Sequence, residues 1–155
     1  MDSAPGVKQI EILLVEDNPG DVRLTREALK DSKLVNKLHV VGDGDEALAF
    51  LHKQNKHANA PRPDLIVLDL NLPKKSGLEV LAEIKEDPDL KCIPVVVLTI
   101  SKSEAEVLQT YNLQANCFIS KPIGLEEFLD VVKSIEEFWL SIVRLPPKSQ
   151  RSAGE

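Results

Sequence analysis

The chain of 155 residues is 43% hydrophobic and 28% charged, which is typical of one soluble globular domain. A formal net charge of −6 argues against nonspecific nucleic-acid binding, because DNA and RNA are themselves polyanions. The apolar runs are too short to cross a membrane, and residues 1–9 lack the pattern of a secretory signal. Cys92 and Cys117 form no zinc motif and are expected to be reduced core residues of a cytoplasmic protein.

The first half of the chain predicts two strand–helix pairs. Residues 10–17 form a continuous apolar run ending in acids, which is typical of a strand buried on both faces. Asn18 is a favourable N-cap residue, and Pro19 suits the first position of the helix that follows. A short strand at residues 37–41 and a helix at residues 44–54 come next.

The second half continues the alternation. Ser76 and Glu79 have the three-residue spacing of a capping box at a helix start. Three more strands, separated by helices and followed by a long final helix, are predicted at residues 64–70, 93–99 and 115–122. Strands that alternate with helices predict an α/β fold with a doubly wound parallel sheet.

Polar residues stand at the carboxyl ends of four of these strands. Glu16 and Asp17 end the first strand, Asp69 the third, Thr99 the fourth and Lys121 the fifth. Ligands of doubly wound sheets bind at this edge, so these side chains are expected to converge there. Each residue alone is better explained as a cap, a strand residue or a surface charge, and it is their combination that indicates a site.

The residue types in this group suit phosphoryl transfer. Three neighbouring carboxylates repel one another unless a cation lies among them, and oxygen ligands suit Mg²⁺. Asp69 is ionised at neutral pH and can attack a phosphoryl group to give an aspartyl phosphate without a general base. Lys121 and Thr99 would then interact with the phosphoryl oxygens.

At these residues the sequence resembles a response-regulator receiver domain of two-component signalling. The resemblance extends from about residue 10 to about residue 141, and its motifs are VEDNPGD, LIVLDLNLPKKSG, VVVLTIS and FISKP. It implies a flavodoxin-like five-stranded (βα)5 sheet with strand order 2-1-3-4-5. It also implies that Asp69 accepts a phosphoryl group from a histidine kinase.

The resemblance also assigns roles to individual residues. Metal binding falls to Glu16, Asp17, Asp69 and Asn71. Of the acidic pair, Asp17 is the expected direct Mg²⁺ ligand, and Asn71 contributes its backbone carbonyl. Phosphate binding and the conformational switch fall to Thr99, Lys121 and Phe118. Ile100 departs from the small residue common in the family, which we interpret as tuning of the switch.

More narrowly, the sequence is similar to the small stand-alone regulators that partner cyanobacterial phytochromes. The shared features are the EDNPGD opening, the polar loop before PDLIVLDLNLP, and the ending IEEFWLSIVRLP. This similarity implies a single-domain regulator that catalyses only its own phosphotransfer and dephosphorylation and is not a metabolic enzyme. The expected organisation is an arm at residues 1–9, a receiver domain at 10–143 and a flexible tail at 144–155.

The predicted final helix carries more apolar surface than one sheet can cover. Burying one of its stripes leaves Phe138, Trp139 or Ile142 partly exposed, and exposed apolar patches usually mark partner sites. We therefore expect a homodimer through this helix and its neighbours, as the phytochrome-partner resemblance also implies. The alternative is that the helix end folds back on its own domain.

Two alternative functions share the aspartyl nucleophile or the flavodoxin-like fold, and the sequence lacks a feature that each would need. A metal-dependent phosphohydrolase with an aspartyl nucleophile would place a second Asp two residues after the first, where this chain has Asn71. A flavodoxin-like FMN binder would need a hydroxyl- and glycine-rich loop after the first strand, where this chain has acids.

Overall fold

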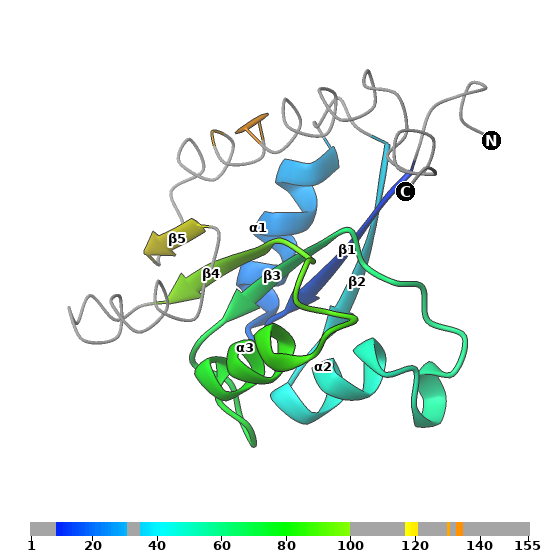
Figure 1. Ribbon diagram of the computed structural model, residues 1–155. Coiled ribbons are helices and arrows are strands. Elements are labelled where there is room, and N and C mark those ends of the chain that lie inside the picture. Colours follow the sequence, from blue (N-terminus) through cyan, green and yellow to red (C-terminus); the bar gives the residue numbers. More distant parts are fainter. Residues whose placement is uncertain (1–8, 31–34, 100–116, 121–129, 131–132, 135–155) are drawn as a thin grey trace.

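Five parallel strands form one sheet in the order β2-β1-β3-β4-β5 (Figure 1). The computed structural model describes residues 9–30, 35–99, 117–120, 130 and 133–134. The strands are β1 (Ile10–Val15), β2 (Asn36–Val41), β3 (Leu65–Asp69), β4 (Val95–Thr99) and β5 (Cys117–Ser120). The predicted flavodoxin-like α/β fold and its strand order are confirmed.

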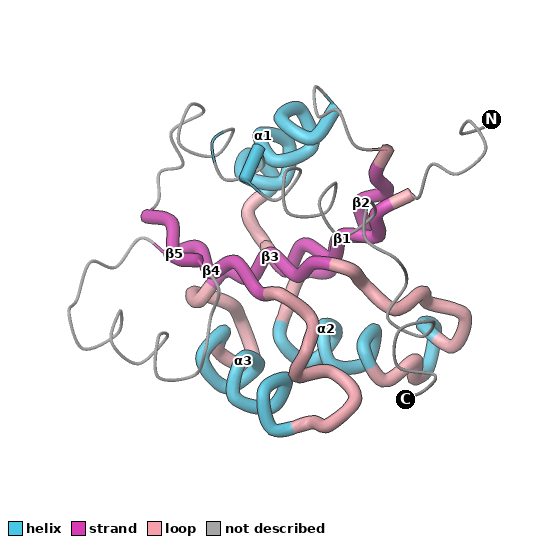
Figure 2. Tube along the Cα trace, turned by 45° about the horizontal axis from the view of Figure 1, so that its top comes forward, coloured by secondary structure: helices cyan, strands magenta, loops and turns pink. Residues whose placement is uncertain are grey.

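Helices cover both faces of this sheet. Helix α1 (Pro19–Lys30) lies on one face, and α2 (Gly44–Leu51) and α3 (Gly77–Glu86) lie on the other (Figure 2). A short 3₁₀ helix, η1 (Asn55–His57), follows α2. The helix predicted between the last two strands lies outside the described residues, and of the final helix only residues 130 and 133–134 are described. No helix in the described ranges is long and apolar enough to span a membrane.

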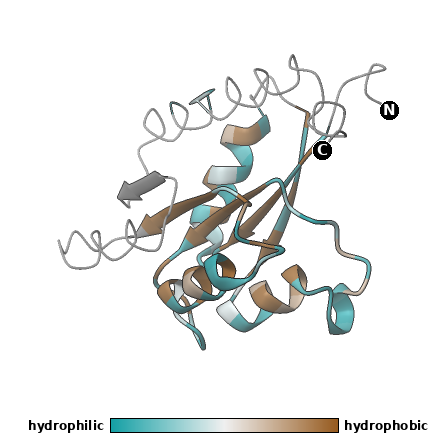
Figure 3. Ribbon diagram, in the orientation of Figure 1, coloured by the Kyte–Doolittle hydropathy of each residue, from teal (hydrophilic) through white to brown (hydrophobic). Residues whose placement is uncertain are grey.

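The continuous apolar runs become strands because helices cover both sides of them. Every residue of β3 is buried, and β3 pairs in parallel with β1 and β4. Most of the length of the central strands is apolar, as their colouring shows (Figure 3). Strand β2 lies at the edge of the sheet, and its Val40 is 37% exposed. The burial of each strand therefore follows its position in the sheet.

Successive residues of one strand pack into two different cores. Leu13 and Val15 of β1 face the core shared with α2 and α3, whereas Ile12 and Leu14 face the core shared with α1. This follows from the alternation of side chains along a strand. Burying one such aliphatic side chain contributes about 1.5–3 kcal/mol, so packing on both faces holds β1 in the sheet between β2 and β3.

Helix starts follow the sequence closely, and helix ends do so less well. Asn18 caps α1 by accepting a hydrogen bond from the Asp21 N–H over 3.1 Å, and Pro19 is the first helical residue, as predicted. Helix α2 ends at Leu51 and not at residue 54, because Lys53 has a left-handed backbone with φ of 56°.

The environment of the cysteines corrects one expectation. Cys92, predicted to lie in the core, is an exposed free thiol. Its neighbour Ile93 is 3% exposed and provides the apolar contact at this point of the chain. The side chain of Cys117 lies outside the described residues.

Candidate functional site

The pairing of β1 with β3 brings three predicted acids together. Val15, the last residue of β1, pairs with Leu68 of β3. Glu16 and Asp17 follow Val15, and Asp69 follows Leu68, so all three stand at the carboxyl edge of neighbouring strands. One carboxylate oxygen from each of the three residues lies within 4.8 Å of the others. The predicted convergence of Glu16, Asp17 and Asp69 is therefore present in the structure.

The three carboxylates differ in exposure. Glu16 and Asp69 are each 2% exposed, whereas Asp17 is exposed to solvent. Burying a carboxylate is unfavourable unless hydrogen bonds or a cation compensate, and Glu16 accepts a hydrogen bond from the Asn18 N–H over 3.2 Å. An all-oxygen donor set that is open to water on one side suits a hard divalent cation that keeps some of its water ligands.

The turn after β3 fixes the orientation of Asp69. The backbone N–H of Asn71 donates to Asp69 Oδ1 over 3.0 Å. The N–H of Leu70 donates to the Leu98 carbonyl over 2.9 Å, which continues the β3–β4 ladder beyond Asp69. Asn71 thus lies directly beside the acidic cluster.

The remaining predicted site residues are described only in part. Thr99 is the last residue of β4 and pairs with Ser120, so its backbone lies at the same sheet edge as Asp69. Phe118 lies within β5 and pairs with Val97, and its side chain is not among the described atoms. Outside the described residues lie Lys121, Ile100, Phe138, Trp139 and Ile142.

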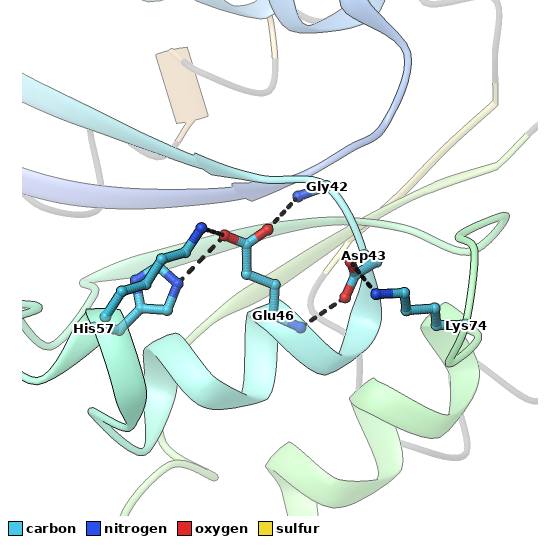
Figure 4. A network of polar contacts seen from close by, with 6 residues as sticks. Gly42, Asp43, Glu46, His57 and Lys74 are labelled. Carbon is cyan, nitrogen blue, oxygen red and sulfur yellow. Dashed lines mark hydrogen bonds and ion pairs between the residues drawn. The ribbon is translucent and has the colours of Figure 1, made fainter.

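Sequence reasoning missed a polar network next to the turn after β2. Asp43 caps α2 by accepting the Glu46 N–H over 2.7 Å, and its other oxygen lies 3.6 Å from Lys74 Nζ (Figure 4). Glu46 Oε2 lies 3.1 Å from Lys56 Nζ and 3.3 Å from His57 Nε2. The spacing of Asp43 and Glu46 is the only sequence signal for this network, because the other partners come from distant segments.

This network lines an open pocket of about 460 Å³ between α2, η1 and the loop after β3. Partial burial opposes ionisation of Glu46, but the Gly42 N–H, the Lys56 ammonium and the His57 ring together lower the pKa of this carboxyl below its ordinary value of 4.5. Glu46 is therefore held in its charged form, and it ties η1 to α2.

Comparison with known proteins places the chain in a family. The model of the response regulator receiver domain matches residues 12–133, and the chain belongs to this family. It is 53% identical to the response regulator Rcp1 of Synechocystis sp. over 135 residues, which cover 87% of this chain and 92% of that protein. The resemblance to receiver domains, and the narrower similarity to phytochrome regulators, are confirmed.

Solved structures show the same relationship. The Mn²⁺-bound form of Rcp1 superposes with a TM-score of 0.77 at 52% identity, covering 89% of this chain and 99% of that chain. The phosphorylated cyanobacterial phytochrome response regulator RcpA superposes with a TM-score of 0.78 at 53% identity, covering 90% of this chain and 100% of that chain. Receiver-domain chemistry is thus favoured over the phosphohydrolase and FMN alternatives.

Proposed function

We propose that this chain is a phosphoacceptor response regulator in which Asp69 receives a phosphoryl group from a histidine kinase. The observation that carries the proposal is the cluster of Glu16, Asp17 and Asp69 at the carboxyl edge of β1 and β3. Two relatives of known structure, one phosphorylated and one bound to Mn²⁺, support it. The similarity to phytochrome regulators makes a phytochrome-type kinase the proposed phosphodonor.

Asp69 acts as the nucleophile in this mechanism. One of its carboxylate oxygens forms a bond to phosphorus, the bond between phosphorus and the donor's histidine nitrogen breaks, and the leaving nitrogen keeps the electron pair. The Asn71 N–H holds Oδ1 and so fixes the rotation of the attacking group. Thr99 and Lys121 are proposed to contact the phosphoryl oxygens, and Phe118 is proposed to report the change to partners.

The metal proposed for this site is Mg²⁺. Glu16, Asp17, Asp69 and the backbone carbonyl of Asn71 would hold it, with Asp17 as the direct ligand of the acidic pair. When bound, the metal neutralises charge on the carboxylates and on the incoming phosphoryl oxygens. Oxygen donors and one solvent-exposed side match the coordination that Mg²⁺ prefers.

Labelling with a small acyl phosphate in the presence of Mg²⁺ tests the proposal. The wild-type chain should gain one phosphoryl group by intact-mass spectrometry, and Asp69→Asn should gain none. Glu27→Gln, a charge removal on the exposed surface of α1, is the matched control and should label normally. Labelling that survives Asp69→Asn, or steady turnover of a phosphomonoester, would contradict the proposal. Chelation of the metal should stop labelling.

Dimerisation is proposed from the sequence of the final helix within a receiver domain at residues 10–143, between the arm and the tail. Phe138, Trp139 and Ile142 would form the apolar contact. Sedimentation velocity over a dilution series should show a dimer for the wild-type chain and for Phe138→Tyr, and a monomer for Phe138→Asp. If the wild-type chain is a monomer at micromolar concentration and Phe138→Asp does not change its sedimentation, the proposed dimer is contradicted.

A further inference from the structure

The turn between β2 and α2 lies directly against the loop that follows Asp69. A Cβ atom built on Gly44 would overlap the backbone carbonyl oxygen of Lys75, and it would lie 2.8 Å from Lys75 Cβ and 2.9 Å from Val80 Cγ2. Real Cβ atoms essentially never approach other heavy atoms closer than 3.0 Å. Position 44 therefore has room only for hydrogen, and the neighbouring loop, not the backbone conformation of Gly44, imposes this limit.

A second contact joins the same two segments. Asp43, adjacent to Gly44, keeps one carboxylate oxygen on the cap of α2 and points the other toward Lys74 Nζ, 3.6 Å away (Figure 4). Lys74 has a left-handed backbone with φ of 66°, which costs about 1–3 kcal/mol for a residue with a side chain. Such a conformation persists only where surrounding contacts support it, and the turn before α2 supplies two of them.

The loop is also fixed at its far end. The Gly77 N–H donates to the Leu70 carbonyl over 3.0 Å, and a Cβ on Gly77 would lie 2.5 Å from Leu70 Cα. Between these fixed points stands Asn71, whose N–H orients Asp69. Residues 71–76 are thus held by contacts at both ends of the loop and at Lys74 and Lys75, and Asn71 lies between these contacts.

We propose that Gly44 is a positioning residue for the metal and phosphoacceptor site, and that it acts through the loop between β3 and α3. This inference rests on the proposed function of Asp69. A side chain at position 44 pushes the Lys75 backbone away and shifts the Asn71 backbone, which both orients Asp69 and supplies the proposed carbonyl ligand. Asp43 reinforces the same contact through Lys74.

The test compares two glycines of one turn. Gly44→Ala should weaken Mn²⁺ binding, measured by electron paramagnetic resonance, and should slow acyl-phosphate labelling by about 10- to 100-fold, the effect of a misplaced reacting group. Gly42→Ala is the matched control, because a Cβ there meets nothing within 4 Å, and it should stay within about twofold of wild type. Gly44 is the first residue of α2, and alanine has a higher helix propensity than glycine, so Gly44→Ala does not lower stability through helix propensity.

Two further variants remove the ion pair between Asp43 and Lys74, and they test the proposal even if Gly44→Ala does not fold. Asp43→Asn keeps a good N-cap residue but removes the charge facing Lys74, and Lys74→Met removes the partner. Each should slow labelling by about two- to fivefold, because a partly exposed ion pair contributes little. Their double variant should be no worse than either single one.

The outcomes separate this inference from the proposed function. Native metal affinity and labelling in folded Gly44→Ala overturn the positioning role, as does an equal loss in Gly42→Ala. If Gly44→Ala is unfolded, wild-type behaviour of both Asp43→Asn and Lys74→Met overturns it. A wild-type chain that neither binds Mn²⁺ nor labels on Asp69 contradicts the proposed function instead.

Discussion

The backbone N–H of Asn71 donates to Asp69 Oδ1 over 3.0 Å, so the carboxylate closes a turn through the backbone two residues on. Asp side chains commonly hydrogen-bond in this way where a strand ends. Here the same carboxylate also belongs to the acidic cluster with Glu16 and Asp17. The turn therefore links the conformation of the loop after β3 to the direction in which Asp69 points.

Removing one acid from the cluster should have opposite effects on metal binding and on the stability of the metal-free protein. Asp17→Asn should weaken Mg²⁺ or Mn²⁺ binding by at least about 10-fold, since it removes a charged oxygen ligand. It should also raise the thermal unfolding midpoint of the metal-free protein, because three carboxylates within 4.8 Å repel one another. Calorimetric titration and thermal melts with and without metal measure the two effects.

The control is Asp21→Asn, which removes an acid from the first turn of α1, outside the cluster. It should leave metal affinity unchanged. If metal-free Asp17→Asn unfolds at or below the midpoint temperature of metal-free wild type, repulsion within the cluster does not significantly lower the stability of the protein.

The capping box at the start of α3 should contribute measurably to stability. Ser76 Oγ accepts the Glu79 N–H over 3.2 Å, and the Ser76 N–H donates to Glu79 Oε1 over 3.0 Å. Ser76→Ala should lower the free energy of unfolding by about 0.5–2 kcal/mol, whereas Ser76→Asp keeps an acceptor and should cost less than Ser76→Ala. Urea denaturation compares them, and equal losses in both variants would contradict the capping explanation.

Glu46 should give the protein a pH-dependent component of stability. Its pKa is lower in the folded protein than its ordinary value of 4.5, so its contribution is present above pH 4.5 and is lost as pH falls through the folded pKa. The stability difference between wild type and Glu46→Gln should therefore be larger at about pH 7 than at about pH 3.5. Urea denaturation at the two pH values measures it, with exposed Glu86→Gln as the control. A difference that is independent of pH would refute the prediction.

The core on the α2 and α3 side should be sensitive to lost volume. Leu13 of β1 is 0% exposed, and Leu13→Ala should lower the free energy of unfolding by about 2–5 kcal/mol, because it leaves a cavity between the sheet and two helices. Val40→Ala on the edge strand β2, where the side chain is 37% exposed, should change stability by about 0.5 kcal/mol or less. Chemical denaturation measures the free energy of unfolding of both variants. Similar losses of stability in Leu13→Ala and Val40→Ala would contradict the assignment of Leu13 to the core and Val40 to the exposed edge.

Most of the fold was predictable because the inner strands are buried on both faces, and their sequences are therefore nearly continuous apolar runs. The acids of the site were predictable for a related reason: Asp69 breaks an apolar run at the carboxyl end of its strand. The exposure of Cys92 was not predictable from its apolar neighbours, since the burial of one residue in a turn depends on the path of the chain. The roles of Gly44 and Lys74 could not be read from either segment alone, because their contact joins residues far apart in sequence.

The position of β1 between β2 and β3 affects how the chain assembles during synthesis. Strand β1 is made first, and β2, its neighbour on one side, follows soon afterwards. Its partner on the other side, β3, starts only at Leu65, the residue that pairs with Ile12. A nascent chain that has reached only α2 therefore presents an apolar strand with one unpaired edge, and such edges promote association between growing chains. Emergence of the segment that carries Asp69 closes that edge, so the residue proposed to carry the signal arrives together with the strand that completes the hydrogen bonding of β1.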